Sequence, residues 1–413
     1  MDLVIRHPTP DEMVAFVTTM NTGFLEPVDA EKAEKVAEEL RQLWDLDRLW
    51  AAFDGDRLVG TFRSFATQLT VPGCAQVPGS ALTAVSVMAD HRRRGILRAM
   101  VAAEHAAARD RGEVLGLLYS AEYPIYGRFG YGPATEEATW TLDALAAQFH
   151  GEPSGSVELV PPSEATRDEM IRVFEARRAT SVGEVARLPY RWDYSLALRR
   201  TAWGDDWKGF VAFHHGPSGD IDGYVRYHAE PEHWERRQPR NTIVIDDLQA
   251  LNPVARGDLW RFLANTDWVA TVRLERGSLV EPLPWLLRNG RAAIRTEGGD
   301  AVWVRLLDMR RALEARTYER EGRVVLEVVD GEAAGGRARF ALDAGPSGAT
   351  CAPTDRSPDL TLDISALGAA YLGWSRLRDA ILSHGADEHR PGALEEATAL
   401  FATLEVPWCS TFF

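Results

Sequence analysis

The sequence predicts a multidomain protein of the α/β and α+β classes, for three reasons. The chain of 413 residues is too long for one ordinary hydrophobic core. Its first part alternates predicted strands and helices, and the opening order returns after residue 155, which indicates an internal repeat. Beyond residue 300 the predicted elements follow an α+β pattern. We therefore expect three domains, at residues 1–150, 151–296 and 297–413.

The first unit begins with short alternating elements. Apolar patterning predicts a strand, two helices and a hairpin, and the Asp54-Gly55 step is a strong signal for a tight turn in that hairpin. These elements occupy residues 3–6, 12–24, 29–43, 49–53 and 58–69.

The stretch from residue 80 to residue 133 holds the clearest chemical signal. A β-rich run at 82–88 leads to a predicted helix at 96–111, and the turn between them places three arginines, residues 92–94, before Gly95. The helix dipole disfavours each cation there by a few tenths to about 1 kcal/mol, so an anion is expected at this turn. Gly95 lets backbone N–H groups approach phosphate oxygens. A solvated basic turn is the alternative, whereas the spacings of the P-loop and of the dinucleotide-binding glycine motif do not fit.

The second and third units are predicted from similar patterns. A strand at 157–162 and a helix at 164–179 repeat the opening order of the first unit. In the later turn of this second unit, Arg256 and Gly257 resemble the arginine turn of the first unit. The basic cluster is absent there, and an acidic residue, Asp258, is present instead. A break near residues 297–300 precedes strands predicted at 301–309, 323–330 and 338–343 and helices predicted at 365–379 and 392–404.

Composition limits the classes of ligand and the kind of compartment that fit this protein. The net charge of -15 argues against nucleic-acid phosphates as the main partner and allows cationic ligands, although simple solubility is the alternative. Cys74, Cys351 and Cys409 are too few and too widely separated for a disulfide framework or a zinc cluster, which favours a reducing cytoplasm and no metal. The sequence begins without an apolar leader and has no apolar run of membrane-spanning length, so we expect a soluble protein without membrane contact.

Several segments together resemble one enzyme family. HRRRGILRAM resembles the R-x-x-G-x-[GA] coenzyme A loop of GCN5-related N-acetyltransferases (GNAT), with Arg92 and Gly95 matching and Leu97 departing from the final small residue. With VSVMADHRRRGILR, IYGRFGYGPAT and ISALGAAYLGW, the chain is similar to the Eis (enhanced intracellular survival) family over nearly its whole length. The resemblance implies two tandem GNAT-like domains, the second degenerate, a sterol-carrier-protein-like C-terminal domain, and a homohexamer.

The resemblance also implies how acetyl-CoA is held. The backbone N–H groups of Val85 and Val87 are expected to bind the pantetheine arm and the thioester carbonyl, and Arg92, Arg93 and Gly95 to bind the pyrophosphate. The second copy, which lacks the basic cluster, is expected not to hold coenzyme A.

The expected general acid is Tyr126. With Gly130 and Tyr131 it forms a Y-x-x-x-G-Y segment that resembles the Tyr-x-x-x-Gly-Phe segment of the superfamily. A phenol with a pKa near 10 stays protonated at neutral pH and can donate a proton to a departing thiolate. Core packing is the alternative for Tyr126, as it is for Tyr119 and Tyr123.

The expected base is the α-carboxylate of the last residue, which by resemblance would be that of Phe413. The apolar ending with Trp408 and Phe412 favours an inserted terminus, while a buried domain end and a docking tail are the alternatives. His105, on the helix after the arginine turn, is expected to have a solvent or packing role.

By resemblance, Phe24 and Glu26 are expected to bind substrate, and Glu405 with the terminal carboxylate would complete an acidic mouth suited to a polyamine. The leading hypothesis is thus an acetyl-CoA-dependent N-acetyltransferase acting on multi-amine substrates such as aminoglycosides. A protein lysine N-acetyltransferase is the second hypothesis. A lipid-binding carrier, in which the GNAT domains are scaffolds, is the hypothesis from another class.

Overall fold

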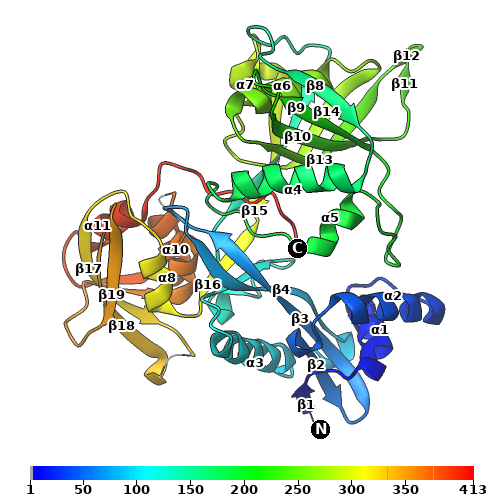
Figure 1. The fold of residues 1–413 in the computed structure, drawn as a ribbon. Helices are drawn as coiled ribbons and strands as arrows, with labels where there is room; N and C mark the ends of the chain where they lie inside the picture. The colour runs from blue at the N-terminus through cyan, green and yellow to red at the C-terminus, as the bar shows by residue number, and fades with distance from the viewer. Residues whose placement is uncertain (1–2, 333, 375) are drawn as a thin grey trace.

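Three large β-sheets form the framework of the chain (Figure 1). The computed structural model describes residues 3–332, 334–374 and 376–413. Two sheets have seven strands each and the third has five. The predicted combination of α/β and α+β units is confirmed.

The first sheet has the strand order β1-β2-β3-β4-β5-β16-β6, and β4 and β5 form its parallel pair. Side chains alternate along β2, so Ala51 and Phe53 pack against helices α1 and α2, whereas Ala52 packs with helix α3 on the opposite face. The bounds are β1 Leu3–Arg6, α1 Met13–Gly23, α2 Ala30–Leu43, β2 Leu49–Asp54, β3 Arg57–Thr70, β4 Gln76–Val87, α3 Ile96–Asp110, β5 Leu115–Tyr119, β6 Gly132–Pro133 and β16 Val302–Leu306.

The second sheet repeats this plan with the order β15-β7-β14-β13-β10-β9-β8, and β13 and β14 form the parallel pair. The internal repeat is therefore real at the level of topology. A small hairpin, β11 with β12, projects from it (Figure 1). The bounds are β7 Glu136–Asp143, β8 Ser156–Val160, α4 Glu164–Arg178, α5 Pro189–Ser195, β9 Phe210–His215, β10 Ile221–Ala229, β11 Trp234–Glu235, β12 Gln238–Pro239, β13 Asn241–Ala250, α6 Pro253–Ala264, β14 Val269–Gly277, α7 Leu283–Leu286 and β15 Ala293–Asp300.

The two seven-stranded sheets exchange strands near the places where the sequence suggested domain boundaries. Strand β7 falls within the expected range 1–150 but lies in the second sheet, where it pairs with β14 and β15. Strand β16 falls within the expected range 297–413 but lies in the first sheet, between β5 and β6. A boundary drawn at residue 150 or 296 therefore separates strands from the sheets to which they are hydrogen-bonded.

The third sheet has the order β19-β18-β17-β20-β21. The helix expected at 365–379 is interrupted: α9 ends at Ala370, Gly373 has a φ of +101°, and α10 begins at Arg376, with residue 375 outside the described residues. Such a left-handed glycine ends a helix readily. The bounds are α8 Met309–Ala315, β17 Gly322–Val329, β18 Arg337–Gly345, β19 Gly348–Pro353, β20 Leu360–Asp363, α9 Ile364–Ala370, α10 Arg376–His384, β21 Ala386–Glu388 and α11 Ala393–Phe401.

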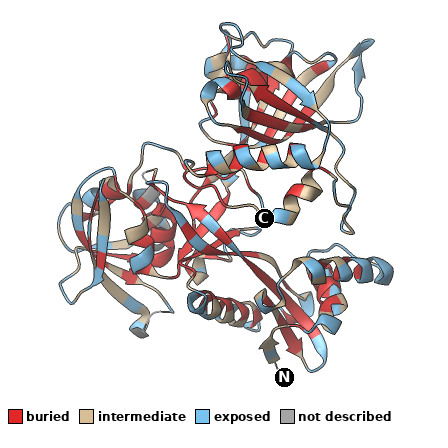
Figure 2. Ribbon diagram, in the orientation of Figure 1, coloured by how far each residue is buried: buried red, intermediate tan, exposed pale blue. Residues whose placement is uncertain are grey.

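One hydrophobic core joins the first and third domains. Figure 2 shows buried residues running from the first sheet into the third domain without a break. The cluster combines Leu117 of β5, Val304 of β16 and Leu367 of α9 with Cys409 and Phe413 at the end of the chain. The contact is close, because a Cβ on Gly368 of α9 would lie 2.2 Å from the Val304 carbonyl oxygen. The C-terminus is therefore part of the core that supports β5.

Candidate active site

Strands β4 and β5 part at one end of the first sheet. Their register runs as far as Leu82 opposite Leu118, after which β4 continues to Val87 while β5 ends at Tyr119. Ala84 has a φ of +52°, and the register with β3 shifts there, so this part of β4 is a β-bulge. The gap leaves one edge of β4 without a strand partner beyond Leu82.

Backbone donors of β4 face this gap. The Met88 amide donates to the Val59 carbonyl oxygen of β3 at 2.9 Å. Because N–H groups alternate along a regular strand, the N–H of Val87 points away from β3. Val85 lies within the bulge, between Ser86 and Thr83, which pair with β3. The predicted cofactor-binding residue Val87 therefore has its donor toward the open side, and Val85 lies beside it in the bulge of the same strand.

The arginine turn follows directly. Arg93 has a φ of +64° and Gly95, at the N-terminus of α3, has a φ of +82°. His91 is buried under the turn, with Nδ1 2.8 Å from Asp90 and Nε2 3.2 Å from the Asp54 carboxylate. Arg92, Arg93 and Gly95 are exposed. The turn therefore presents cations and the helix N-terminus to solvent, which suits an anionic ligand.

Tyr126 lies beside the parted strands. Its side chain is only 9% exposed and packs in one cluster with Met100 of α3, Leu118 of β5 and the two valines of β4. Burial, with a smaller contribution from the charge of Glu122, raises the pKa of Tyr126 to about 12. The hydroxyl group therefore stays protonated at neutral pH. Tyr123, by contrast, is 61% exposed.

A buried polar network underlies Tyr126, and sequence reasoning missed it. The ring of Tyr131 stands edge-on to that of Tyr126, with centroids 6.1 Å apart, and its hydroxyl lies 2.8 Å from His105 Nε2. His105 Nδ1 lies 2.7 Å from Oε1 of Glu332, in the third domain. His105 is therefore neither solvent-exposed nor simple packing. It sits on the buried face of α3 four residues after Val101, a spacing that was visible in the sequence.

The protonation states in this network follow from burial and charge. Burial lowers the pKa of His105, even though the Glu332 carboxylate opposes this shift. Burial by itself raises the pKa of Glu332, but the His105 hydrogen bond and the charge of Arg305 hold it at about 2. Neutral His105 can then donate from Nδ1 to Glu332 and accept from the Tyr131 hydroxyl. Arg305 also donates to the Phe129 carbonyl oxygen at 2.7 Å, which fixes the loop after Tyr126.

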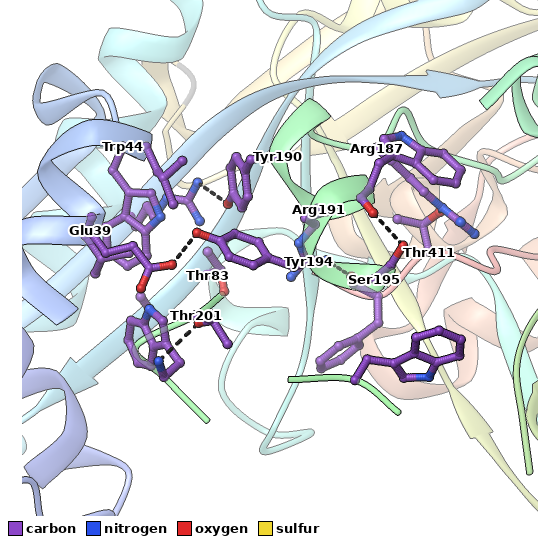
Figure 3. Close-up of a pocket in the computed structure, with 18 of the residues that line it drawn as sticks. Glu39, Trp44, Thr83, Arg187, Tyr190, Arg191, Tyr194, Ser195, Thr201 and Thr411 are labelled. Atoms are coloured by element: carbon purple, nitrogen blue, oxygen red, sulfur yellow. Dashed lines mark hydrogen bonds between the residues drawn. The ribbon is translucent and has the colours of Figure 1, made fainter. Parts of the chain in front are cut away.

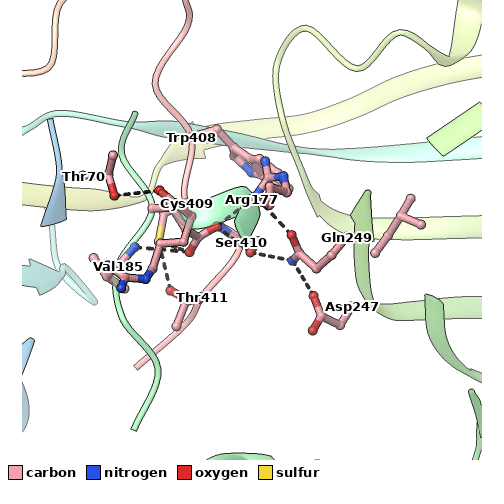
Figure 4. Close-up of polar contacts among 12 residues, drawn as sticks. Thr70, Arg177, Val185, Asp247, Gln249, Trp408, Cys409, Ser410 and Thr411 are labelled. Carbon is pink, nitrogen blue, oxygen red and sulfur yellow. Dashed lines mark hydrogen bonds and ion pairs between the residues drawn. The ribbon is translucent and has the colours of Figure 1, made fainter. Parts of the chain in front are cut away.

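The C-terminal segment runs between the domains (Figure 4). The Trp408 amide donates to the Val182 carbonyl oxygen at 3.1 Å, and the Ser410 hydroxyl donates to Glu184 at 2.6 Å. Further along, the hydroxyl of Tyr119, the last residue of β5, donates to the Thr411 carbonyl oxygen at 2.9 Å. The segment is therefore anchored at several points before it ends.

Phe413 ends next to the parted strands. Its side chain is 7% exposed and stands edge-on to Phe65 and Tyr119, with ring centroids 5.4 Å and 5.1 Å away. Tyr119 is the point at which β5 stops and the gap opens. The structure therefore brings the terminus, the predicted source of the base, to the end of the sheet that also carries Tyr126.

A cavity of about 900 Å³ opens where the first two domains and the C-terminal segment meet (Figure 3). Its walls come from α1, α2, the bulge of β4, α5, the segment 201–207 and residues 410–412. The predicted substrate residues Phe24 and Glu26 line it, and both are exposed. Glu405 does not line it: burial raises the pKa of Glu405, and its neighbours are Val182 and Arg177.

The expected acidic mouth is not what the structure contains. Five carboxylates line the cavity, namely Glu26, Glu39, Asp205, Asp246 and Asp247, and so do five arginines, namely Arg63, Arg187, Arg191, Arg226 and Arg276. The charges of the wall therefore balance. Sequence reasoning missed the arginines because they come from β3, α5, the segment before α5, β10 and β14, which only the tertiary fold brings together.

The second copy is degenerate in its local structure. Asn252 caps α6 by accepting from the Ala255 amide at 2.8 Å, so the helix N-terminus is already satisfied. Arg256 pairs with the buried Glu281 at 2.5 Å and so does not present its charge to solvent. The gap beside β13 and β14 is lined by Trp408 of the C-terminal segment. In the second copy the helix N-terminus, the arginine and the gap between the strands are thus already filled by contacts within the chain. In the first copy the corresponding groups face solvent.

The described part of the chain shows two further absences. It contains no group of three or more His, Cys, Asp or Glu side chains that could hold a metal ion. Among the same residues, no helix is long and apolar enough to cross a membrane.

Comparisons with known proteins agree with this arrangement. Models of the acetyltransferase (GNAT) domain match residues 4–134 and 183–332, and a sterol carrier protein domain matches residues 309–410. A protein described as an uncharacterized N-acetyltransferase from Streptomyces griseus is 38% identical over the whole of both chains. N-acetyltransferase Eis from Mycobacterium tuberculosis is 36% identical over 78% of this chain and 77% of its own.

Solved structures give the same result. The crystal structure of Eis1 from Mycobacterium abscessus covers 100% of both chains with a TM-score of 0.84 and 31% sequence identity. A GCN5-related N-acetyltransferase from Anabaena variabilis shares the fold over 100% of both chains, with a TM-score of 0.82 and 21% identity. The protein is an N-acetyltransferase, and the chain belongs to the Eis family of GCN5-related N-acetyltransferases.

Proposed function

We propose that the chain transfers the acetyl group of acetyl-CoA to an amine of a small molecule bound in the 900 Å³ cavity. One observation carries this proposal. The parted strands, the exposed arginine turn, the buried Tyr126 and the C-terminal residues all lie at the same end of the first sheet. This is the set of groups that acetyl transfer from a thioester requires.

The cosubstrate is assigned to the first domain alone. The N–H groups of Val85 and Val87 would hold the pantetheine arm and polarise the thioester carbonyl, and losing one such donor costs roughly 3 kcal/mol in comparable acyl-transfer sites. Arg92, Arg93 and the backbone at Gly95 would hold the pyrophosphate. Their exposure and the left-handed turn support this assignment.

Two groups handle the protons. The amine nitrogen attacks the acetyl carbon, the C–N bond forms and the C–S bond breaks, with the electron pair leaving on sulfur. Tyr126 donates a hydrogen bond and then its proton to that sulfur, and recovers a proton from water. Because the pKa of Tyr126 is about 12, full transfer to a thiolate of pKa about 8.5 is uphill by roughly 5 kcal/mol. Hydrogen bonding to the developing charge is therefore the first contribution of the hydroxyl.

The terminal carboxylate of Phe413 receives the ammonium proton through water. A carboxylate with a pKa of about 3.5 is a weak base for an ammonium with a pKa near 10, so it acts mainly by positioning the ammonium and selecting the neutral amine. The place of Phe413 beside Tyr119 supports this role.

The acceptor class is proposed from the cavity and the family together. A cavity of 900 Å³ matches a drug-sized ligand. Aminoglycosides, the multi-amine class expected from the sequence, are one candidate group, with exposed Glu26 and Phe24 as contacts. We also propose a homohexamer in the cytoplasm, as the family resemblance implies.

The test is acetyl-CoA turnover on a panel of aminoglycosides, simple aliphatic and aromatic amines and lysine peptides, followed by mass spectrometry of the products. Acetylation of small amines at a higher kcat/KM than of any lysine peptide supports the proposal. Turnover of peptides alone contradicts it, and the absence of acetyl-CoA binding by calorimetry would favour the lipid-carrier alternative. Sedimentation velocity measures the assembly.

A further inference from the structure

Two arginines flank one hydroxyl on the inner wall of the cavity. Arg63, on β3, is 7% exposed, and its Nη2 donates to the Tyr190 hydroxyl at 3.3 Å. Arg191, the next residue of α5, also lines the cavity and donates to the carbonyl oxygen of Phe412. Figure 3 shows Tyr190 and Arg191 on the same wall as Trp44, whose ring lies 4.3 Å from the guanidinium carbon of Arg63.

These two cations differ from Arg187 and Arg226 of the same wall, whereas the fifth arginine, Arg276, lies with its guanidinium carbon 3.8 Å from the centroid of the Phe412 ring. Arg187 forms an ion pair with Asp247, and Arg226 forms one with Asp246. Within the described residues, no carboxylate forms an ion pair with Arg63 or Arg191. Burial lowers the pKa of both groups, which is the direction expected of cations withdrawn from water without a counter-ion.

An uncompensated cation away from water is costly unless it receives an anion and further hydrogen bonds. The planar guanidinium group fits a carboxylate, with two parallel N–H donors for its two oxygens. Two guanidinium groups around one tyrosine hydroxyl therefore form a built site for a carboxylate.

The chain's own terminus is the nearest internal candidate for this carboxylate. Arg191 is engaged with the carbonyl of Phe412, a neutral group one residue before the end. The ring of Phe413 is turned to Phe65 and Tyr119. Under the proposed function its carboxylate serves the amine, so the two arginines are left for a carboxylate from outside the chain.

The remaining wall suits an apolar body. Trp44 and Trp203 face one another with ring centroids 6.4 Å apart, and Trp207, Tyr194 and Phe412 also line the cavity. Aromatic walls of this kind bind aromatic or extended apolar groups. The carboxylates that line the same cavity at its exposed side are Glu26 and Asp205.

We propose that Arg63, Arg191 and the Tyr190 hydroxyl bind a carboxylate of the acceptor, and that the acceptor is an amine with an aromatic or apolar body that also carries this carboxylate. This inference rests on the proposed function and narrows its substrate class.

The experiment compares two amines that differ at one group, 4-(aminomethyl)benzoate and 4-(aminomethyl)benzamide, together with homologues in which one or two methylenes extend the amine arm. We expect kcat/KM for the best carboxylate to exceed that of its carboxamide by about ten- to a hundredfold, the range for hydrogen bonds to a charged partner. In Arg63→Gln and in Arg191→Gln this ratio should fall to near one, and Arg63→Lys should restore part of it. Arg226→Gln is the matched control, because Arg226 is a cavity cation with its own carboxylate, and it should keep the ratio.

A binding arm separates this inference from the proposed function. Calorimetry with 3-phenylpropionate and 3-phenylpropanamide needs no turnover, and only the carboxylate should bind measurably and lose binding in the two glutamine variants. If no amine is acetylated but 3-phenylpropionate still binds in this way, the proposed function fails and the anion site stands. If the wild type acetylates neutral or polycationic amines without preferring the carboxylate, the inference is wrong and the function stands. An unchanged carboxylate-to-carboxamide ratio with an equal loss of kcat on both amines in Arg63→Gln would assign these arginines to the Phe413 carboxylate and overturn the inference.

Discussion

Removing the charge of Glu332 should damage both the stability of the fold and the rate of acetyl transfer. Glu332 accepts from buried His105 at 2.7 Å and pairs with Arg109 and Arg305 at 2.8 Å and 3.1 Å. Its pKa of about 2 lies below the ordinary value of 4.5. Because Glu332 is partly exposed, solvent screening reduces the stabilisation by the ionised form to about 1–2 kcal/mol. Glu332→Gln should therefore lower the free energy of unfolding at pH 7 by about this amount.

The pH dependence follows from the sign of the shift. Because the folded pKa is depressed, the stabilisation is fully present above pH 4.5 and is lost as the pH falls from 4.5 towards about 2. Thermal melting of the wild type should fall steeply across this range, and the difference from Glu332→Gln should shrink there. The effect on rate comes through Tyr131, because a loosened loop misplaces Tyr126, and we expect kcat to drop about tenfold with KM for acetyl-CoA little changed.

A matched control lies in the same third domain. Glu327, on β17, also has a pKa of about 2, because Arg339 and Arg337 donate hydrogen bonds to it, and it has no contact with His105. Glu327→Gln should be less stable than the wild type at neutral pH, and this difference should shrink in acid, but kcat should not change. Equal kcat in the two variants would refute the idea that the network positions Tyr126.

Three other changes test the assigned roles. Tyr126→Phe should lower kcat by roughly 10²- to 10⁴-fold with unchanged acetyl-CoA binding, and a rate within threefold of the wild type would remove Tyr126 from the mechanism. Because the pKa of Tyr126 is about 12, the wild-type rate should not decline through loss of this proton below about pH 10. An Ala-Ser extension after Phe413 displaces the terminal carboxylate and should lower kcat by roughly 10²-fold, measured as release of free coenzyme A, whereas full activity would rule out the terminal base. Arg92→Ala and Arg93→Ala should each raise KM for acetyl-CoA by about tenfold and weaken its salt dependence. Arg256→Ala in the second copy should lower the melting temperature and leave the KM for acetyl-CoA unchanged. An equal rise in KM in all three variants would contradict the assignment of the cofactor to the first domain.

The sequence was informative wherever a local pattern determines structure. The strand before the arginine turn, Gly95 and the helix after it form one continuous segment, so their spacing predicted these elements, and anion binding at the turn stays a prediction. The buried position of Tyr126 beside this segment is consistent with the role predicted for it, which stays a prediction. Contacts between distant segments were not predictable: His105 and Glu332 are 227 residues apart, and nothing in either local sequence identifies its partner.

The same reason explains the errors at the cavity. Glu405 was grouped with Glu26 because both are acidic, but the chain turns at Trp408 toward Val182, and this leaves Glu405 outside the cavity wall. Arg63 and Arg191 come from two domains, and each looks ordinary in its own segment. Their joint position depends on how the first two domains meet.

Until strand β16 has been synthesised, the growing chain exposes an unpaired strand edge. Strand β16 covers β5 with five paired residues, and β5 is the last strand of the first sheet that the N-terminal 150 residues place beside β4. A chain truncated before residue 302 leaves the edge of β5 bare, and bare edges pair readily with strands of other molecules. During synthesis the ribosome has to produce some 180 further residues before this edge is sealed. The N-terminal domain is thus a candidate client for chaperones until β16, which ends at Leu306, has been synthesised.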